Sequence, residues 1–149
     1  MLNHLRSAFL IAVACSVPSL CQTARQSTTQ NPPITLELSN QTAPINDPIT
    51  LFTPAKSGLF RASIYVEVIQ AAIQPATLFP RFVYTNDTGI NNDNFYNSFP
   101  TDVGVISDTS GVVTFRAEAN TPVMVVAPFS GGTTTGYSYN LYVYIERLF

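Results

Sequence analysis

Residues 58–69 read GLFRASIYVEVI, and apolar and polar side chains alternate along this stretch. One side of an extended chain carries the apolar set, which comprises Phe60, Ala62, Ile64, Val66 and Val68. The opposite side carries Arg61, Ser63, Tyr65 and Glu67. Successive side chains of a strand point to opposite faces, so this period of two predicts a strand with one buried and one wet face. Such strands are typical of antiparallel sheets.

Similar runs recur from residue 34 to the end of the chain, separated by Pro, Gly, Asn and Asp. The expected strands are 34–38, 49–53, 58–69, 78–85, 103–107, 111–118, 121–128 and 136–147. Short β-branched and aromatic runs at this spacing predict an all-β fold. We expect a single domain over 34–149, a two-sheet antiparallel β-sandwich of jelly-roll type with about eight strands.

The composition excludes several classes of protein. The chain has 149 residues, a net charge of −2 and only 11% charged residues, and Lys56 is its single lysine. Nucleic-acid binding, which needs a clustered basic surface, is therefore not expected. Both cysteines and the one histidine, at Cys15, Cys21 and His4, precede the domain. We expect no thiol or imidazole catalysis, no zinc site and no cofactor.

Residues 1–24 resemble a signal peptide, with Arg6 followed by the apolar run 7–20. The run is too short for a comfortable membrane span, so a secreted or cell-surface protein is predicted, with the periplasm as an alternative. Cleavage after Cys21 or after Ala24 fits the small residues found there, and Cys15 could instead be lipidated in a lipobox. Residues 25–33 are polar, end in two prolines and predict a linker.

Residues 51–63, LFTPAKSGLFRAS, resemble the F-T-x-P-x-x-G-x-Y segment that leads into a central strand in jelly rolls of the complement globular-head and tumour-necrosis-factor type. The apolar, aromatic final strand is similar to theirs, and the pattern over 34–149 also resembles small secreted bacterial proteins and phage-fibre tips. These families are usually homotrimeric binding heads, so the resemblance implies a jelly roll and a three-fold assembly.

The segment 85–102 is rich in carboxylates and amides. Asp87, Asn91 and Asp93 are a candidate calcium site because calcium prefers clustered oxygen ligands. The alternative is a solvated loop, since Asn and Asp favour turns for backbone reasons. The aromatic residues Phe95, Tyr96 and Phe99 either fold back as a lid on the sandwich or contact a sugar or protein ligand.

The polar sides of three strands form the candidate interface. Its residues are Arg61, Tyr65, Glu67, Arg116, Tyr142 and Tyr144. If these strands are neighbours, the side chains form either a solvated sheet face or a surface between subunits, where Tyr and Arg are enriched and Lys is depleted. We predict self-association here, with a glycan or protein ligand as a further possibility.

Carboxylate pairs offer the one remaining route to catalysis. Hydrolysis of a glycosidic bond needs two acidic groups about 5–9.5 Å apart. Asp102 with Asp108, or Glu67 with Glu118, are formal candidates without a surrounding motif. The sequence therefore favours an exported, non-catalytic binding or assembly module, and a small hydrolase is the rival from another class.

Overall fold

The computed structural model describes residues 33–86, 98–131 and 135–149, and within these ranges the chain forms strands and no helix. The strands are β1 (Ile34–Gln41), β2 (Ile45–Phe52), β3 (Gly58–Gln70), β4 (Thr77–Leu78), β5 (Arg81–Val83), β6 (Thr101–Asp102), β7 (Asp108–Ala117), β8 (Val123–Ala127), β9 (Phe129–Ser130) and β10 (Ser138–Arg147). Every pairing between them is antiparallel.

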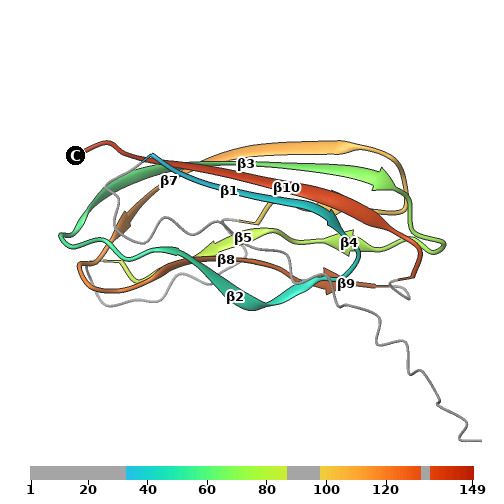
Figure 1. Ribbon diagram of the computed structural model, residues 1–149, viewed down its shortest axis with the longest axis horizontal. Coiled ribbons are helices and arrows are strands. Elements are labelled where there is room, and N and C mark those ends of the chain that lie inside the picture. The colour runs from blue at the N-terminus through green and yellow to red at the C-terminus, as the bar shows by residue number, and fades with distance from the viewer. Residues whose placement is uncertain (1–32, 87–97, 132–134) are drawn as a thin grey trace, which may run out of the picture.

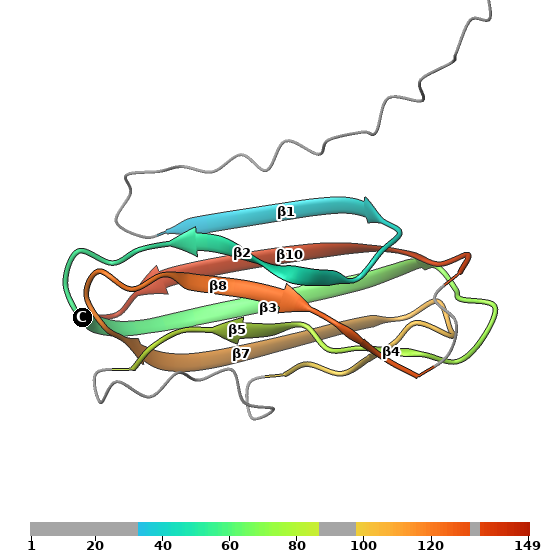
Figure 2. The ribbon, with the colours of Figure 1, turned by 90° about the horizontal axis from the view of Figure 1, so that it is seen from below.

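The strands form two layers, as Figure 1 shows. One layer is a four-stranded sheet in the order β1-β10-β3-β7. The other contains β2-β8-β5 and continues into the short sheet β6-β4-β9, because β4 runs into β5 and β8 runs into β9 along the chain. Figure 2 shows this second layer in front of the first. The predicted all-β, two-sheet antiparallel sandwich is confirmed.

Alternation along the long strands places the core. The even-numbered residues of β3 from Phe60 to Val68 are buried, and so are the odd-numbered residues of β10 from Tyr139 to Ile145. Both sets point between the layers, as the period of two predicted. Burying these side chains is the main favourable term in the stability of the sandwich.

An aromatic cluster joins the two layers. The ring of Phe115 on β7 lies 5.9 Å from that of Phe60 on β3, measured between centroids. Across the layers it lies 6.3 Å from Phe82 on β5 and 4.3 Å from Tyr84. Such ring contacts add to the burial of their apolar area. Phe115 is therefore the central contact between the sheets at this end of the sandwich.

Two expected strands differ from the observed ones. The segment 103–107 is not a strand: pairing ends at Asp102, whose Oδ1 accepts a hydrogen bond from the backbone N–H of Gly104 at 2.7 Å. This local bond turns the chain, as Asp side chains often do. The expected strand 78–85 is split into β4 and β5, with Pro80, which has no N–H to donate, between them.

Several predictions concern residues outside the described ranges. These are the signal peptide 1–24, nearly all of the linker 25–33, the calcium candidates Asp87, Asn91 and Asp93, and the aromatic residues Phe95 and Tyr96. In the part of the chain that is described, no helix has the length and apolar character needed to cross a membrane.

Candidate functional site

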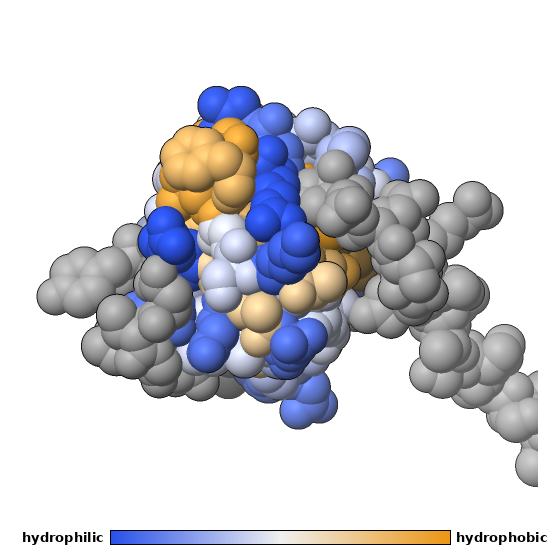
Figure 3. All heavy atoms as spheres, turned by 90° about the vertical axis from the view of Figure 1, so that its left-hand side faces the viewer, coloured by the Kyte–Doolittle hydropathy of each residue, from blue (hydrophilic) through white to orange (hydrophobic). Residues whose placement is uncertain are grey.

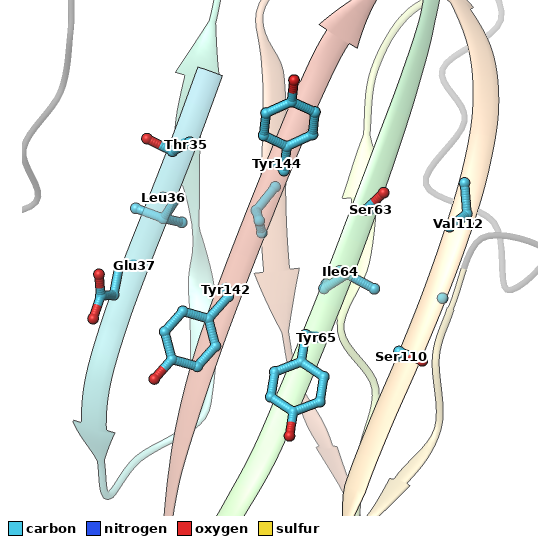
Figure 4. A pocket seen from close by; sticks show the side chains of 12 residues that line it. Thr35, Leu36, Glu37, Ser63, Ile64, Tyr65, Ser110, Val112, Tyr142 and Tyr144 are labelled. Atoms are coloured by element: carbon cyan, nitrogen blue, oxygen red, sulfur yellow. The ribbon is translucent and has the colours of Figure 1, made fainter. Parts of the chain in front are cut away.

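The outer surface of the four-stranded sheet gathers the predicted interface residues on one side. We call this surface the tyrosine face. Strand register arranges its side chains in rows that run across the strands. The Tyr65 row contains Glu37, Tyr142, Tyr65 and Ser110. The Ser63 row contains Thr35, Tyr144, Ser63 and Val112. Figure 4 shows both rows across β1, β10, β3 and β7.

Two more rows flank these and carry most of the charge. The Arg61 row contains Glu146, Arg61 and Thr114, and the Glu67 row contains Asn140, Glu67 and Asp108. Arg116 lies on the same side of β7, one row beyond Thr114. All six predicted interface residues therefore share this face, because β10, β3 and β7 are neighbours in the sheet.

The tyrosines form the centre of the face. The rings of Tyr65 and Tyr142 lie 5.9 Å apart between centroids and are tilted by 37°. Tyr65 is 37% exposed and Tyr144 43% exposed, so both rings present apolar surface to solvent. The hydroxyl of Tyr65 donates a hydrogen bond to Oδ2 of Asp108 at 3.3 Å. Partial desolvation and then the charge of Asp108 raise the pKa of Tyr65 above its usual value.

Small side chains beside the tyrosines leave the face hollowed. The hollow has a volume of about 760 Å³ and crosses all four strands. Ser63, Ser110 and Gly111 line it next to Tyr65, and Thr35 lines it on the far side of Tyr144. Large rings next to small residues give the surface ridges and recesses that a partner can fit.

Charge is distributed unevenly along the face. In the Arg61 row, Nε of Arg61 donates to Oε1 of Glu146 at 2.6 Å in an ion pair. In the Glu67 row, the amide of Asn140 donates to Oε2 of Glu67 at 3.0 Å, and Glu67 lies directly opposite Asp108. The Glu67 end is thus acidic, whereas the Arg61 end contains two arginines and one carboxylate.

One of the two predicted carboxylate pairs is not brought together. Glu67 lies near the far end of β3, while Glu118 follows the residue paired with Gly58, about 30 Å away along the strand. That spacing is far beyond the range for a glycosidase pair, so the Glu67–Glu118 hypothesis is wrong. Asp102 takes part in the turn at Gly104, whereas Asp108 lies on the tyrosine face. Among the described residues, no three His, Cys, Asp or Glu side chains are grouped to hold a metal ion.

Phe99 folds back onto the sandwich. Its ring packs against the core and occupies the space in which a Cβ on Gly111 would lie. For Phe99 this is the lid arrangement, whereas the loop contact at Phe95 and Tyr96 stays a prediction because both lie outside the described residues. Gly111 is thus required here by a close approach, since any larger residue would displace the ring.

Sequence reasoning missed about half of the face. Glu37, Ser63, Ser110 and Val112 line the hollow, and none was among the predicted interface residues. Glu37 is polar between the apolar Leu36 and Leu38, so the period of two is consistent with its outward position. Nothing in the sequence placed the strand of Glu37 beside β10, however, because the pairing joins residues about 100 positions apart or more.

Apolar surface also gathers at both ends of the sandwich. Leu148 and Phe149 are exposed where the chain terminates, and Figure 3, which views this end, shows hydrophobic and hydrophilic areas side by side. At the opposite end, Ile73 and Ile106 are 79% and 75% exposed. These loops supply off-face positions for control variants.

Comparisons with solved structures place this geometry within a known fold. The globular domain of a zebrafish complement 1qA protein matches at a TM-score of 0.54 and 12% identity, covering 80% of this chain and 98% of that one. The fold is a jelly roll. At that identity the likeness shows the fold alone, and it agrees with the resemblance noted at residues 51–63.

A second structure is more distant. The CBM22-1 xylan-binding domain of Paenibacillus barcinonensis Xyn10C matches at a TM-score of 0.30 and 12% identity, covering 85% of this chain and 78% of that domain. Neither the family models nor the curated proteins give a match to the chain.

Proposed function

We propose that the protein is an exported, non-catalytic binding module whose copies associate through the tyrosine face. The observation that carries the proposal is the composition of that face. It exposes Tyr65, Tyr144, two arginines and, at 62% exposure, Val112, with Tyr142 half-buried among them, and it contains no lysine. Tyr and Arg are enriched and Lys is depleted at protein–protein interfaces, where Tyr buries its ring and keeps a partner for its hydroxyl.

The size of the face limits the area that two copies can bury. Strands β7 and β10 are 10 residues long. At about 3.3 Å per residue and about 4.8 Å between strands, four such strands present roughly 500–600 Å² per copy. Two copies would bury about 1,000–1,200 Å², at the lower end of specific interfaces. We expect association in the micromolar range, which depends visibly on concentration.

The test is the mass of the domain in solution, measured by size-exclusion chromatography with light scattering. The double variant Tyr65→Glu and Tyr144→Glu should be monomeric where the parent is associated, because it places unpaired charges in the interface. Both positions are solvent-exposed in the monomer, so its melting temperature should change little.

A matched control adds the same charges off the face. Ile73→Glu with Ile106→Glu changes two exposed apolar residues at one end of the sandwich and should leave association intact. A parent domain that is monomeric at high micromolar concentration overturns the proposal. If only the control variant dissociates, the interface lies at the end of the sandwich and not on the tyrosine face.

Export is tested separately, at the amino terminus. If residues 1–24 are a signal peptide, mass spectrometry of secreted protein should find a chain that begins after Cys21 or Ala24. A chain that begins at a lipid-modified Cys15 would support the anchored alternative. Recovery of the chain still carrying Met1 as the main secreted species would contradict both.

A carbohydrate ligand on the same face is the second candidate. The hollow places tyrosine rings beside the hydroxyls of Ser63, Ser110 and Thr35 and the carboxylate of Glu37. Ring faces can stack on sugars, while hydroxyl and carboxylate groups bind sugar hydroxyls. A glycan array probed with the parent and with Tyr142→Ala decides it: binding that is lost in the variant supports a glycan, and no binding removes this candidate.

A further inference from the structure

We infer that two copies pair face to face about a two-fold axis that lies across the strands, between Ser63 and Tyr65, so that the strands of the two copies run in opposite directions. This inference rests on the proposed self-association and adds the symmetry and the residues that meet. Such an axis lays β3 over the partner's β3 and exchanges the rows. The Tyr65 row then faces the Ser63 row, and the Arg61 row faces the Glu67 row.

Charge is the first argument for this arrangement. Arg61 and Glu67 are six residues apart on β3, about 20 Å, and the axis lies midway between them. Arg61 of each copy therefore faces the partner's Glu67, which gives two equivalent ion pairs. Arg116, one row beyond Thr114, approaches the partner's Asp108 from the neighbouring row. Each acidic end meets a basic end, and charge complementarity of this kind fixes register.

Shape is the second argument. The exchange places the ring of Tyr65 over the partner's Ser63, the smallest side chain in the opposing row. Tyr142 lies over the partner's Tyr144, an aromatic pair. The hollow beside Ser63 of one copy thus receives the ring of Tyr65 from the partner. Symmetry repeats the same contact with the two copies exchanged.

Polar groups outside the ion pairs also meet compatible groups. Glu146 faces the partner's Asn140, which has an amide to donate, and Asp108 faces the partner's Thr114, which has a hydroxyl. Glu37 faces the partner's Thr35. No two like charges oppose one another in this arrangement.

Other symmetries bring like charges together. The sequence resemblance implies a three-fold assembly. In such an assembly with parallel strands, the same row of side chains from each of the three copies meets at the axis. Glu67 and Asp108 of three copies would then meet at one level of the face, where no basic side chain lies. A two-fold axis parallel to the strands likewise sets the two acidic ends side by side. Like charges in a desolvated interface are strongly unfavourable, so both arrangements are disfavoured.

Two charge reversals provide the test. In Arg61→Glu, two carboxylates face each other at both symmetric contacts, and in Glu67→Arg, two arginines do. Each variant alone should dimerise at least about tenfold more weakly than the parent, since close interfacial charge pairs are worth more than about 1.4 kcal/mol. Arg61 has a half-exposed side chain and Glu67 is partly exposed, so both variants should stay folded and keep the parent's circular dichroism.

Mixing the two variants is the decisive measurement. In an equimolar mixture, the carboxylate introduced by Arg61→Glu faces the guanidinium introduced by Glu67→Arg. At the second contact, the unchanged Glu67 of the first variant faces the unchanged Arg61 of the other. Both contacts of the mixed dimer are attractive, so dimer mass should return in sedimentation velocity. Lys56→Glu, a charge reversal on an exposed loop off the face, is the control. It should not weaken dimerisation of the otherwise unchanged domain, and mixing it with either reversal should not restore dimerisation.

Each outcome separates the two claims. A parent domain that stays monomeric overturns the proposed self-association. A trimeric parent retains self-association and overturns the two-fold inference. A dimeric parent in which Glu67→Arg has no effect, or in which the mixture does not recover, overturns the pairing of Arg61 with Glu67.

Discussion

The tyrosines on the two sides of the four-stranded sheet differ in burial and therefore in role. Tyr137 and Tyr139 lie on the inner side and are 2% and 0% exposed. Their rings stack at 6.0 Å between centroids, and Phe129 meets Tyr137 edge-on. Tyr142 and Tyr144, a few residues along the same chain, lie on the outer side. Alternation along one strand therefore separates rings that stabilise the fold from rings that remain available to a partner.

The hydroxyl groups make the difference sharper. A buried hydroxyl loses its water and needs a partner, whereas an exposed one does not. The hydroxyl of Tyr139 donates to the carbonyl oxygen of Ala43 at 3.1 Å. That of Tyr137 has no partner among the residues that the structure describes. The inner rings contribute packing at some polar cost, and the outer rings keep their hydration until a second surface covers them.

The largest effect expected from this comparison is on β7. Phe115→Ala removes the ring that contacts Phe60, Phe82 and Tyr84, and it should lower the free energy of unfolding by about 3–5 kcal/mol. Val112→Ala, three residues earlier on the outward side, should change it by less than about 0.5 kcal/mol. Denaturant titration measures both.

The measurement belongs at a concentration below that at which copies associate, because assembly adds to apparent stability. A Phe115→Ala domain as stable as Val112→Ala would mean that the inner and outer faces of β7 are assigned the wrong way round.

The parts of the fold that could be predicted from the sequence are those that depend on the local pattern of side chains. The faces of 58–69 and 136–147 follow from side-chain period alone, and both are confirmed. Register does not follow from period. The sequence offered Glu67 with Glu118, and the structure pairs Glu67 with Asp108, because antiparallel pairing from Gly58 onward fixes which residues meet.

Strand ends were predicted less well for a related reason. The apolar run 103–107 has strand-like residues, but the side chain of Asp102 takes a local backbone partner just before it. A hydrogen bond over two residues forms at little entropic cost and competes with a distant strand. The composition of the face, with its tyrosines and arginines, could be predicted; the rows that give it charge at opposite ends could not.

A smaller effect distinguishes Tyr139 within the inner pair. Tyr139→Phe removes the bond to Ala43 and leaves that carbonyl without its donor, so the free energy of unfolding should fall by about 1–2 kcal/mol. Tyr142→Phe, the outward counterpart on β10, should cost nothing measurable in a monomer. Equal losses in the two variants would contradict the assignment of Tyr139 as a bonded inner residue.

Of the two inner tyrosines, Tyr137 should show the smaller effect at neutral pH. Tyr137→Phe keeps the ring contacts with Phe129 and Tyr139 and removes a buried hydroxyl that has no described partner. Because no hydrogen bond is lost, the free energy of unfolding should stay within a few tenths of a kcal/mol or rise. A loss comparable to that of Tyr139→Phe would show that this hydroxyl is bonded in the folded protein.

The free energy of unfolding of Tyr137→Phe should differ more from that of the parent at alkaline pH than at neutral pH. Burial raises the pKa of Tyr137 from 10.0 to about 12 in the folded chain. Between these values the unfolded chain loses the phenolic proton while the folded chain keeps it, so stability falls as the pH rises. Tyr137→Phe removes this ionisation and should lose less stability between about pH 10 and pH 12 than the parent. Parallel stability curves for Tyr137→Phe and the parent would show that Tyr137 ionises as readily in the folded chain as in the unfolded one, and would remove the contrast between the two sides of the sheet at that residue.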